Sequence, residues 1–317
     1  MSVVLDRLVE QQDVTHDLPA DITYSLMAVA KDCPRKLYLR YVRCLDLKNK
    51  KPSLTLGSAV HKFVETGDID QALALYDDVL PQTPEQADRM AIDMATVQAI
   101  AEQYPRFYRP LDIRPEVKFR VPILNPDTGA KSRRFHLSGK ADGIVLDDGK
   151  WWLFELKTAS QITETYIERL RLNLQITTYI YALQRQFGIH FEGVIYRIIR
   201  KPQIKQRRDE SLQQFCERIK EDYRQRPEWY FVEQTVTRTQ DDLDQFEREL
   251  WHFTQVLLFR RRNDFWERNT SKCGEWGGCA FIPICLGYEG AEAFYDIVPP
   301  NVELEDYNEG VEIHGLA

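Results

Sequence analysis

The sequence has no apolar run that approaches the roughly 20 residues needed to cross a lipid bilayer. Its first residues lack the basic and apolar sections of a signal peptide and include four acids, Asp6, Glu10, Asp13 and Asp17. Internal repeats and low-complexity tracts are also missing. These absences argue against membrane, secreted and repeat proteins, and they predict a cytoplasmic globular protein.

The composition supports this class of protein. The 317 residues are 43% hydrophobic and 29% charged, which is ordinary for a soluble protein with a sizeable core. The length allows one large domain with insertions, or two domains.

The C-terminal end lacks basic residues. From Leu286 to Ala317 there are eight acids and no Lys or Arg, so this stretch alone exceeds the net charge of −7 of the whole chain. From Pro299 onward it is too acidic and too poor in apolar residues for firm packing. The rest of the chain is close to neutral, which makes a nucleic-acid partner compatible with the overall charge.

Basic residues cluster in one place. Six occur without an intervening acid, at Arg197, Arg200, Lys201, Lys205, Arg207 and Arg208. Such a run is either a solvated face or a surface that binds the phosphates of DNA.

The stretch from Leu137 to Ala159 predicts two β-strands joined by a tight turn. Leu137–Leu146 is rich in apolar and β-branched residues, Asp147-Asp148-Gly149 has turn chemistry, and Trp151–Leu156 is strongly apolar. Strands of this composition should be buried, and a buried charge is costly unless it is paired or binds a metal ion.

Three charged residues nevertheless lie in this hairpin. Asp142 is inside the first strand, and Glu155 and Lys157 are near the end of the second. Glu155 and Lys157 project from the same face because they are two residues apart. Hairpin pairing can bring Asp142 alongside them. Two carboxylates and an amine would form an oxygen-rich site suited to magnesium or manganese. The alternative is an edge hairpin with a surface ion pair.

At these residues the chain resembles the PD-(D/E)XK nuclease superfamily, whose motif is an Asp, a hairpin and then Glu-x-Lys. Asp142 and Glu155-Leu156-Lys157 match the motif, and Ala141 stands where the family name has Pro. The short motif also arises by chance in charged proteins, so the remaining chain must support it.

The segments before the hairpin are mostly helical. Thr23–Val42 predicts two short helices with Cys33 at their junction, and the segment that begins at Leu56 predicts a helix that carries His61. Asp68–Tyr104 has a helical pattern interrupted by prolines. Pro115–Ile123 is a candidate strand with Glu116 at its beginning.

The segments after the hairpin alternate between helix and strand. Ile162–Phe187 predicts one amphipathic helix, with Gln175 and Tyr179 one turn apart on a face beside its apolar stripe. Glu192–Ile199 is a strand, and two helices follow, Ser211–Tyr223 and Asp241–Arg262. The order of elements predicts an α/β core with a mixed sheet.

Four of the six cysteines form a pattern. Cys273, Cys279 and Cys285 are close together, and Cys33 is distant in sequence. Cys44 and Cys216 are more typical of small core residues. Grouped cysteines in a cytoplasmic protein favour metal binding over disulfides. The paired Cys-x-x-Cys spacing of many zinc sites is missing, and iron–sulfur clusters accept varied spacings.

This arrangement resembles the RecB-like branch of the superfamily, in which one N-terminal and three C-terminal cysteines hold a 4Fe–4S cluster. Its members include nuclease domains of recombination helicase–nucleases and CRISPR adaptation nucleases. The resemblance covers Thr23 to Cys285. It implies that the four patterned cysteines are the cluster ligands, with Cys273 departing from the usual spacing. It also implies a restriction-endonuclease-like mixed sheet flanked by helices, with a helical insertion and a helical lobe stapled by the cluster.

The resemblance also implies roles at the catalytic site. Gly57-x-x-x-His61 is similar to the metal-binding His of the branch, and Gln175-x-x-x-Tyr179 to its helical motif near the active site. His61, Asp142, Glu155 and the Leu156 carbonyl would hold Mg²⁺ or Mn²⁺, and Glu116 would support them. Lys157 would orient or deprotonate water, with its pKa lowered by the metal ion. Each residue also has a structural reading: a core histidine, helix packing or a strand-end acid.

The implied function is a metal-dependent exonuclease acting on single-stranded DNA or DNA ends in recombination, repair or replication, alongside a helicase or recombination proteins. Alternatives are a structure-specific endonuclease, a catalytically silent iron–sulfur DNA-binding subunit, and a zinc-stabilised protein without catalysis. Five segments are expected: a flexible N-terminus (1–20), a helical part (21–110), the nuclease core (111–200), a helical cysteine-bearing part (201–285) and an acidic tail (286–317).

Overall fold

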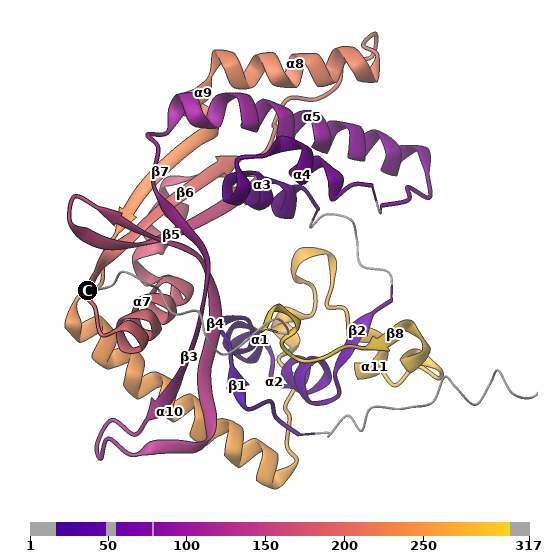
Figure 1. Ribbon diagram of the computed structural model, residues 1–317. Helices are drawn as coiled ribbons and strands as arrows, with labels where there is room; N and C mark the ends of the chain where they lie inside the picture. The colour runs from indigo at the N-terminus through magenta and orange to yellow at the C-terminus, as the bar shows by residue number, and fades with distance from the viewer. Residues whose placement is uncertain (1–16, 49–54, 78, 305–317) are drawn as a thin grey trace, which may run out of the picture. The chain divides into compact units, whose positions relative to one another are not determined.

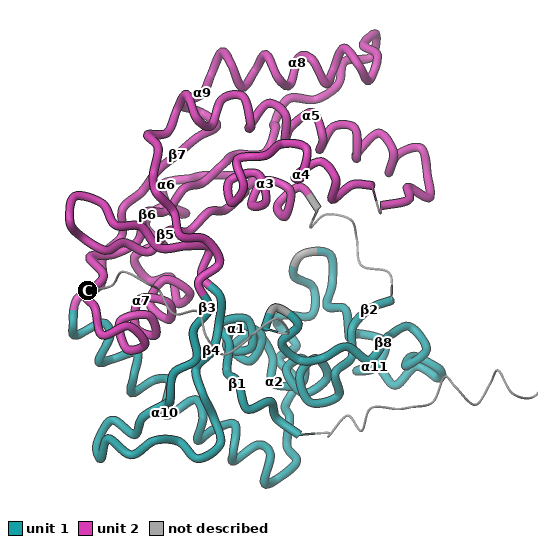
Figure 2. The backbone as a smooth tube through the Cα atoms, in the orientation of Figure 1, with its two compact units in different colours: residues 1–50, 118–140, 240–317 teal, residues 51–117, 141–239 magenta. Residues whose placement is uncertain are grey.

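A computed structural model describes residues 17–48, 55–77 and 79–304 (Figure 1). The chain forms two compact units, one from residues 1–50, 118–140 and 240–317 and the other from residues 51–117 and 141–239 (Figure 2). We call them unit 1 and unit 2. Among the described residues, no helix is long and apolar enough to span a membrane.

Unit 2 contains most of a mixed sheet. Its strands are the end of β4 (Lys131–Asp147), β5 (Lys150–Ala159), β6 (Phe191–Arg200) and β7 (Phe231–Val236). β4 is antiparallel to β5, β7 is antiparallel to β6, and β5 and β6 are parallel to each other. β3 (Ile113–Leu124), which like β4 belongs partly to each unit, pairs with β4. The α/β class and the mixed sheet flanked by helices are therefore confirmed.

Helices cover the unit 2 sheet. A core of buried residues joins β5 and β6 to α3 (Thr55–Thr66), α5 (Pro84–Phe107) and α8 (Leu212–Gln225). That core includes Phe154, Leu156, Ile195 and Ile199, which are alternate residues of the two strands. Residues at the intervening positions, including Glu155, face the other side. The remaining helices of this unit are α4 (Ile69–Ala74), α6 (Glu164–Arg169), α7 (Leu174–Phe187) and α9 (Pro227–Tyr230).

The predicted helix over Ile162–Phe187 is two helices. α6 ends in a 3-10 turn over Leu170–Leu172, and α7 begins after Asn173. The Asn173 side chain accepts a hydrogen bond from the Ile176 N–H, which is the usual way an N-cap begins a new helix. The apolar residues keep a helical spacing through this turn, so the sequence pattern did not reveal the break between the two helices.

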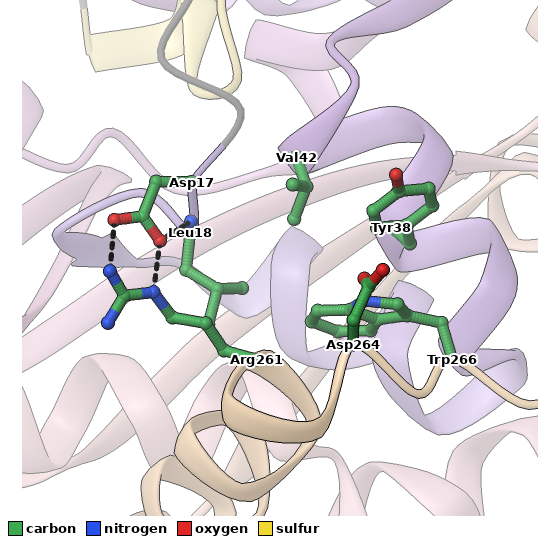
Figure 3. Close-up of a pocket in the computed structure, with 7 residues that line it drawn as sticks. All are labelled: Asp17, Leu18, Tyr38, Val42, Arg261, Asp264 and Trp266. Carbon is green, nitrogen blue, oxygen red and sulfur yellow. Dashed lines mark hydrogen bonds and ion pairs between the residues drawn. The ribbon is translucent and has the colours of Figure 1, made fainter.

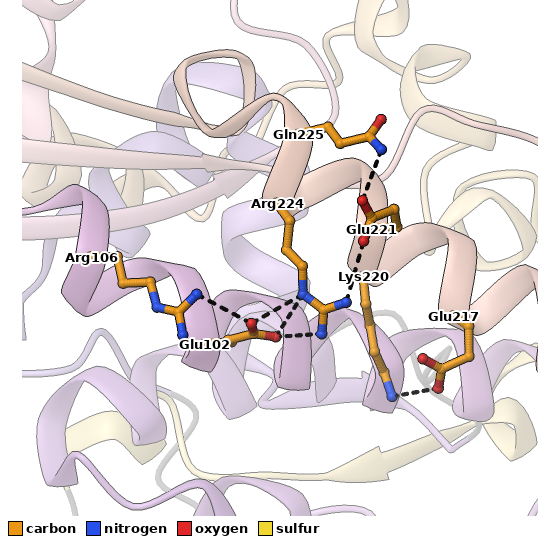
Figure 4. Close-up of polar contacts among 7 residues, drawn as sticks. All are labelled: Glu102, Arg106, Glu217, Lys220, Glu221, Arg224 and Gln225. Atoms are coloured by element: carbon orange, nitrogen blue, oxygen red, sulfur yellow. Dashed lines mark hydrogen bonds and ion pairs between the residues drawn. The ribbon is translucent and has the colours of Figure 1, made fainter.

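Ion pairs on the surface of unit 2 join α5 to α8. Glu102 of α5 accepts hydrogen bonds from Arg224 of α8, the shortest at 2.7 Å, and Lys220 pairs with Glu217 along α8 (Figure 4). These side chains are largely exposed, so each pair contributes little to stability. Only the Glu102–Arg224 pair links the two helices.

Unit 1 combines both ends of the described chain. It contains α1 (Tyr24–Asp32), α2 (Pro34–Leu37), a π-helical turn (Tyr38–Val42), α10 (Gln240–Asn263) and α11 (Ile282–Cys285). β1 (Asp21–Ile22) pairs in parallel with the start of β4, and β2 (Leu45–Leu47) pairs with β8 (Tyr295–Ile297). Thr23 is the N-cap of α1, since its hydroxyl accepts the Leu26 N–H.

The C-terminal segment packs further than its composition suggests. Beyond the strand pairing of β8, the Asn301 amide donates to the Asp21 carbonyl at 3.0 Å, and Arg40 donates to the Pro299 carbonyl. The prediction of loose packing from Pro299 onward is therefore wrong for residues 299–304. The rest of the predicted tail, residues 305–317, lies outside the described residues, as does most of the predicted flexible N-terminus.

Gly193 gives a stability prediction for the sheet. A Cβ at this position in β6 would lie 2.4 Å from the Val236 carbonyl oxygen of β7, closer than atoms can pack. Because the obstacle is backbone, Gly193→Ala should lower the free energy of unfolding by about 2 kcal/mol or more. Gly57→Ala is the matched control, because its Cβ would meet only the Thr158 hydroxyl at 3.6 Å. Equal denaturant midpoints for both variants would contradict the β6–β7 packing.

Candidate active site

Asp142 lies where the hairpin ladder ends. β4 and β5 pair from Asp147↔Lys150 to Gly143↔Phe154, and beyond that point the Asp142 Oδ2 accepts the Leu156 N–H at 2.8 Å. The His61 Nδ1 of α3 lies 3.7 Å from the same oxygen. The predicted approach of Asp142 to the end of β5 is present, and His61 joins it from a helix about 80 residues earlier.

Glu155 is the most deeply buried charged group of this site. It is 1% exposed, and its Oε1 accepts a short hydrogen bond from the Lys157 Nζ. Its second oxygen, Oε2, is buried and has no hydrogen-bond partner among the described residues. A buried carboxylate oxygen without a partner is costly, so this atom is a ready ligand for a cation.

The environment changes the pKa values of this pair. Burial raises the pKa of Glu155 to about 7; Lys157 opposes the shift and Asp142 adds to it. Burial disfavours the charged form of Lys157, but the carboxylates of Glu155 and Asp142 outweigh it and raise the Lys157 pKa above its usual range. The lowered pKa expected from the sequence presupposed a metal ion next to the amine. The protein side chains act in the opposite direction.

Helix α7 adds the predicted Gln–Tyr pair. The Gln175 amide donates to the Tyr179 hydroxyl at 3.1 Å. Burial raises the pKa of Tyr179, and the nearby Glu155 carboxylate raises it further. Both residues therefore lie at the site that Glu155 and Lys157 form.

One neighbour was not predicted. Tyr196 pairs with Glu155 across the parallel strands β5 and β6 and is 2% exposed. Its pKa is raised by burial, by Tyr166 and by the carboxylates of Glu155 and Asp142. The apolar strand around Tyr196 gave no sign in the sequence that this residue lies beside Glu155, because only the strand register brings the two together.

Glu116 is placed less clearly. It is an exposed residue of β3 with a left-handed backbone, at φ 52°, which is uncommon for a residue with a side chain. Its supporting role stays a prediction.

The chemistry of these residues fits a hard divalent cation. Asp142 and Glu155 supply carboxylate oxygens, His61 supplies an imidazole nitrogen, and the Glu155 Oε2 has no other partner. As the side chains stand, no three His, Cys, Asp or Glu in the described ranges are grouped closely enough to hold a metal ion. Lys157 is instead the counter-charge of these carboxylates: its Nζ donates to Glu155, and the Asp142 carboxylate also raises its pKa.

A family model covers the part of the chain that contains these residues. The model of the PD-(D/E)XK nuclease superfamily matches residues 21–286, well over half of the sequence. This chain belongs to the PD-(D/E)XK nuclease superfamily. The matched range contains the whole hairpin, His61, the Gln175–Tyr179 pair and all four patterned cysteines.

Two solved structures are also similar to this PD-(D/E)XK chain. One, titled a "Putative exonuclease" from Eubacterium rectale, is 10% identical and aligns over 83% of this chain and 88% of that one, with a TM-score of 0.41. The other, SSO0001, is 12% identical over 65% of this chain and 78% of that one, with a TM-score of 0.27. No curated protein matches the sequence. The family assignment therefore rests on the family model.

The four patterned cysteines of this PD-(D/E)XK protein gather in unit 1. The Cys33 sulfur accepts the Asn269 N–H at 3.3 Å, and the Cys273 thiol lies 4.0 Å from the Asn269 carbonyl. Cys279 donates its N–H to the Cys273 carbonyl at 2.8 Å. Burial raises the pKa of the Cys285 thiol, and Cys279 and Cys33 contribute to the shift. Four thiols are the donor set of an iron–sulfur cluster or of zinc, but among the described residues no three of these side chains are grouped closely enough to hold a metal ion as they stand.

Only part of the predicted basic surface is exposed in the structure. Arg197 is 1% exposed; it donates to Glu233 and to the Tyr104 hydroxyl and lies over the Tyr108 ring. Arg200 is 7% exposed and donates to backbone carbonyls. The prediction that these two arginines contact DNA is therefore wrong, because both are internal to unit 2. The exposed members of the run are Lys205, Arg207 and Arg208, and Lys201 is half-buried.

A separate cavity of about 490 Å³ lies in unit 1 (Figure 3). Its lining consists of Asp17, Leu18, Tyr38, Val42, Arg261, Asp264 and Trp266. The Asp17–Arg261 ion pair closes one side, and Tyr38 stacks on Trp266 at 5.4 Å on the other. None of the predicted catalytic residues lines this cavity.

The raised pKa of Glu155 predicts a pH dependence of stability. Between about pH 4.5 and 7 the folded protein holds a proton on Glu155 that the unfolded chain releases, so this residue makes folding less favourable as pH rises. Glu155→Gln removes this pH-dependent loss of stability, and Lys157 stays charged over the whole pH range. In metal-chelating buffer, the melting temperature of Glu155→Gln relative to wild type should increase from pH 5 to pH 8 by about 2–6 °C. A constant difference would contradict the burial of this carboxylate.

Proposed function

We propose that this protein is a Mg²⁺- or Mn²⁺-dependent deoxyribonuclease, acting as an exonuclease on single-stranded DNA or DNA ends. The observation that carries the proposal is the convergence of Asp142, Glu155 and Lys157 at the end of a buried hairpin in a PD-(D/E)XK chain. The cost of burying Glu155 with an unpartnered oxygen is explained if that oxygen binds a metal ion.

Each residue has a distinct task in this proposal. Asp142 and Glu155 would hold the metal ion, with His61 and the Leu156 carbonyl as further ligands. When bound, the metal ion lowers the pKa of water and stabilises negative charge on the scissile phosphate. Lys157 would orient or deprotonate that water and neutralise developing charge.

The remaining residues position the substrate. The Gln175 amide is hydrogen-bonded to the Tyr179 hydroxyl. The pair would donate a hydrogen bond to a phosphate oxygen beside Lys157. Glu116 would support the ligands from β3. Lys205, Arg207 and Arg208 are exposed and would track the DNA backbone, as would Lys201 in part.

We further propose that Cys33, Cys279 and Cys285, with Cys273, hold a 4Fe–4S cluster as in the RecB-like branch. The contacts through Asn269 support a common site for these sulfurs. The cluster would be structural, joining α1–α2 to the C-terminal loop of unit 1. A cytoplasmic role in recombination, repair or replication, with a helicase or recombination proteins as partners, accords with this branch.

Linear and circular substrates test the mode of cleavage. The protein should release mononucleotides or short products from 5′- or 3′-labelled linear single-stranded DNA in Mn²⁺ and leave circular single-stranded DNA intact. Linearisation of the circle would instead identify an endonuclease with the same catalytic residues.

A further inference from the structure

Trp229 is an exposed aromatic ring with a buried cation behind it. The residue lies in α9 and is 46% exposed. The Arg200 guanidinium carbon is 3.9 Å from the ring centroid, and the Arg200 Nε donates to the Trp229 carbonyl at 2.9 Å. A second guanidinium nitrogen donates to the Ile162 carbonyl at 3.3 Å. The indole is therefore held rigidly from behind while much of it remains open to solvent.

The strand register places this ring near the catalytic end of the sheet. Glu155, Lys157 and Ala159 of β5 pair with Tyr196, Ile198 and Arg200 of β6. Paired residues of neighbouring strands share a face, so the Arg200 side chain leaves the sheet on the face that carries Glu155 and Lys157. Two strand positions separate Lys157 from the Ala159–Arg200 pair, about 7 Å along the strands. That length corresponds to about two stacked nucleotides.

The charge around the ring suits a polyanion. Lys201 follows Arg200 directly, and Lys205, Arg207 and Arg208 lie on the next loop. The acids of this region are largely neutralised, because Arg218 binds Glu210 and Arg226 binds Asp222. The exposed acids Asp209 and Glu228 offset this positive charge only in part.

We propose that Trp229 is a stacking platform for an unpaired base of single-stranded DNA whose backbone runs to the catalytic carboxylates. The proposal rests on the proposed nuclease function, and it specifies the substrate as single-stranded. Every base has a face that can stack on an indole, and a cation behind the ring adds to the attraction. Bases inside a duplex are stacked on each other and cannot reach the ring. The arrangement also gives Arg200 a role: it supports the aromatic ring and does not contact DNA.

Binding in metal-chelating buffer separates this proposal from catalysis. Fluorescence anisotropy with a labelled single-stranded oligonucleotide and with a blunt duplex should be measured for wild type, Trp229→Ala and Trp229→Phe. Trp229→Ala should weaken single-strand binding by about tenfold and leave duplex binding within about twofold, since one base stack is lost. Trp229→Phe should recover most of the affinity because it keeps an aromatic face.

Phe259→Ala is the matched control, because Phe259 is a 62% exposed aromatic residue of unit 1. It should bind both DNAs as wild type does. Unchanged single-strand affinity in Trp229→Ala, or equal losses for single strand and duplex, would overturn the stacking role. A wild-type protein that binds single strands through Trp229 but never cleaves them would refute only the nuclease function.

Discussion

Glu155→Gln and Lys157→Ala are each expected to reduce DNA cleavage by on the order of 10³-fold or more, at saturating Mn²⁺. Glu155→Gln removes a charged group of the proposed metal site with almost no change of shape, and metal-ion catalysis is worth several kcal/mol of barrier. Lys157→Ala removes the cation that donates to Glu155. It also leaves the buried Glu155 without its ion pair, so its free energy of unfolding should fall by about 1–3 kcal/mol.

The same hairpin offers a control for these two variants. Lys150, at the start of β5, forms an exposed ion pair with Glu192 at 3.4 Å. Lys150→Ala should keep wild-type cleavage and change the free energy of unfolding by no more than about 0.5 kcal/mol. If folded Glu155→Gln retained near wild-type cleavage beside this control, the catalytic assignment would be wrong.

Cys33→Ala is expected to bleach the protein. Anaerobically purified wild type should be brown, with broad visible absorbance and equal amounts of iron and sulfide, as thiolate-held clusters show. Cys33 contributes the sulfur from α1–α2, and its contact with Asn269 joins the two ends of unit 1. Its loss should therefore remove the colour and lower the melting temperature.

Cys216→Ala is the matched control for the cluster. Cys216 belongs to α8 of unit 2, where its thiol lies 3.7 Å from the Ala91 carbonyl, and it should not affect colour or iron content. Stoichiometric zinc without sulfide in the wild type would contradict the cluster and leave the nuclease site untouched.

The catalytic hairpin was predictable because its signals are local. Strand composition, turn residues and the two-residue spacing of Glu155 and Lys157 all lie within one stretch of sequence. His61 and the Gln175–Tyr179 pair required the family resemblance, since nothing in their own helices indicates what they face. Their approach to the site depends on how α3 and α7 pack against β5 and β6.

What the sequence could not show is which charges become buried. The basic run contained no sign that Arg197 would enter an aromatic cage, because its partners Tyr104 and Tyr108 lie about 90 residues earlier. Arg200 is internal for a similar reason, since Trp229 arrives from a later helix. β7 was also missed, because a short strand with alternating exposure is defined mainly by its pairing with β6.

A metal-dependent digestion tests the account most directly. End-labelled single-stranded and duplex DNA should be incubated with wild type and with Glu155→Gln in Mn²⁺, in Mg²⁺ and in excess chelator. We expect wild type to degrade single-stranded DNA with either ion, and no product in chelator or with Glu155→Gln. The proposed nuclease site would be contradicted if folded wild-type protein left every substrate intact in Mn²⁺. Equal cleavage by wild type and Glu155→Gln would contradict it as well.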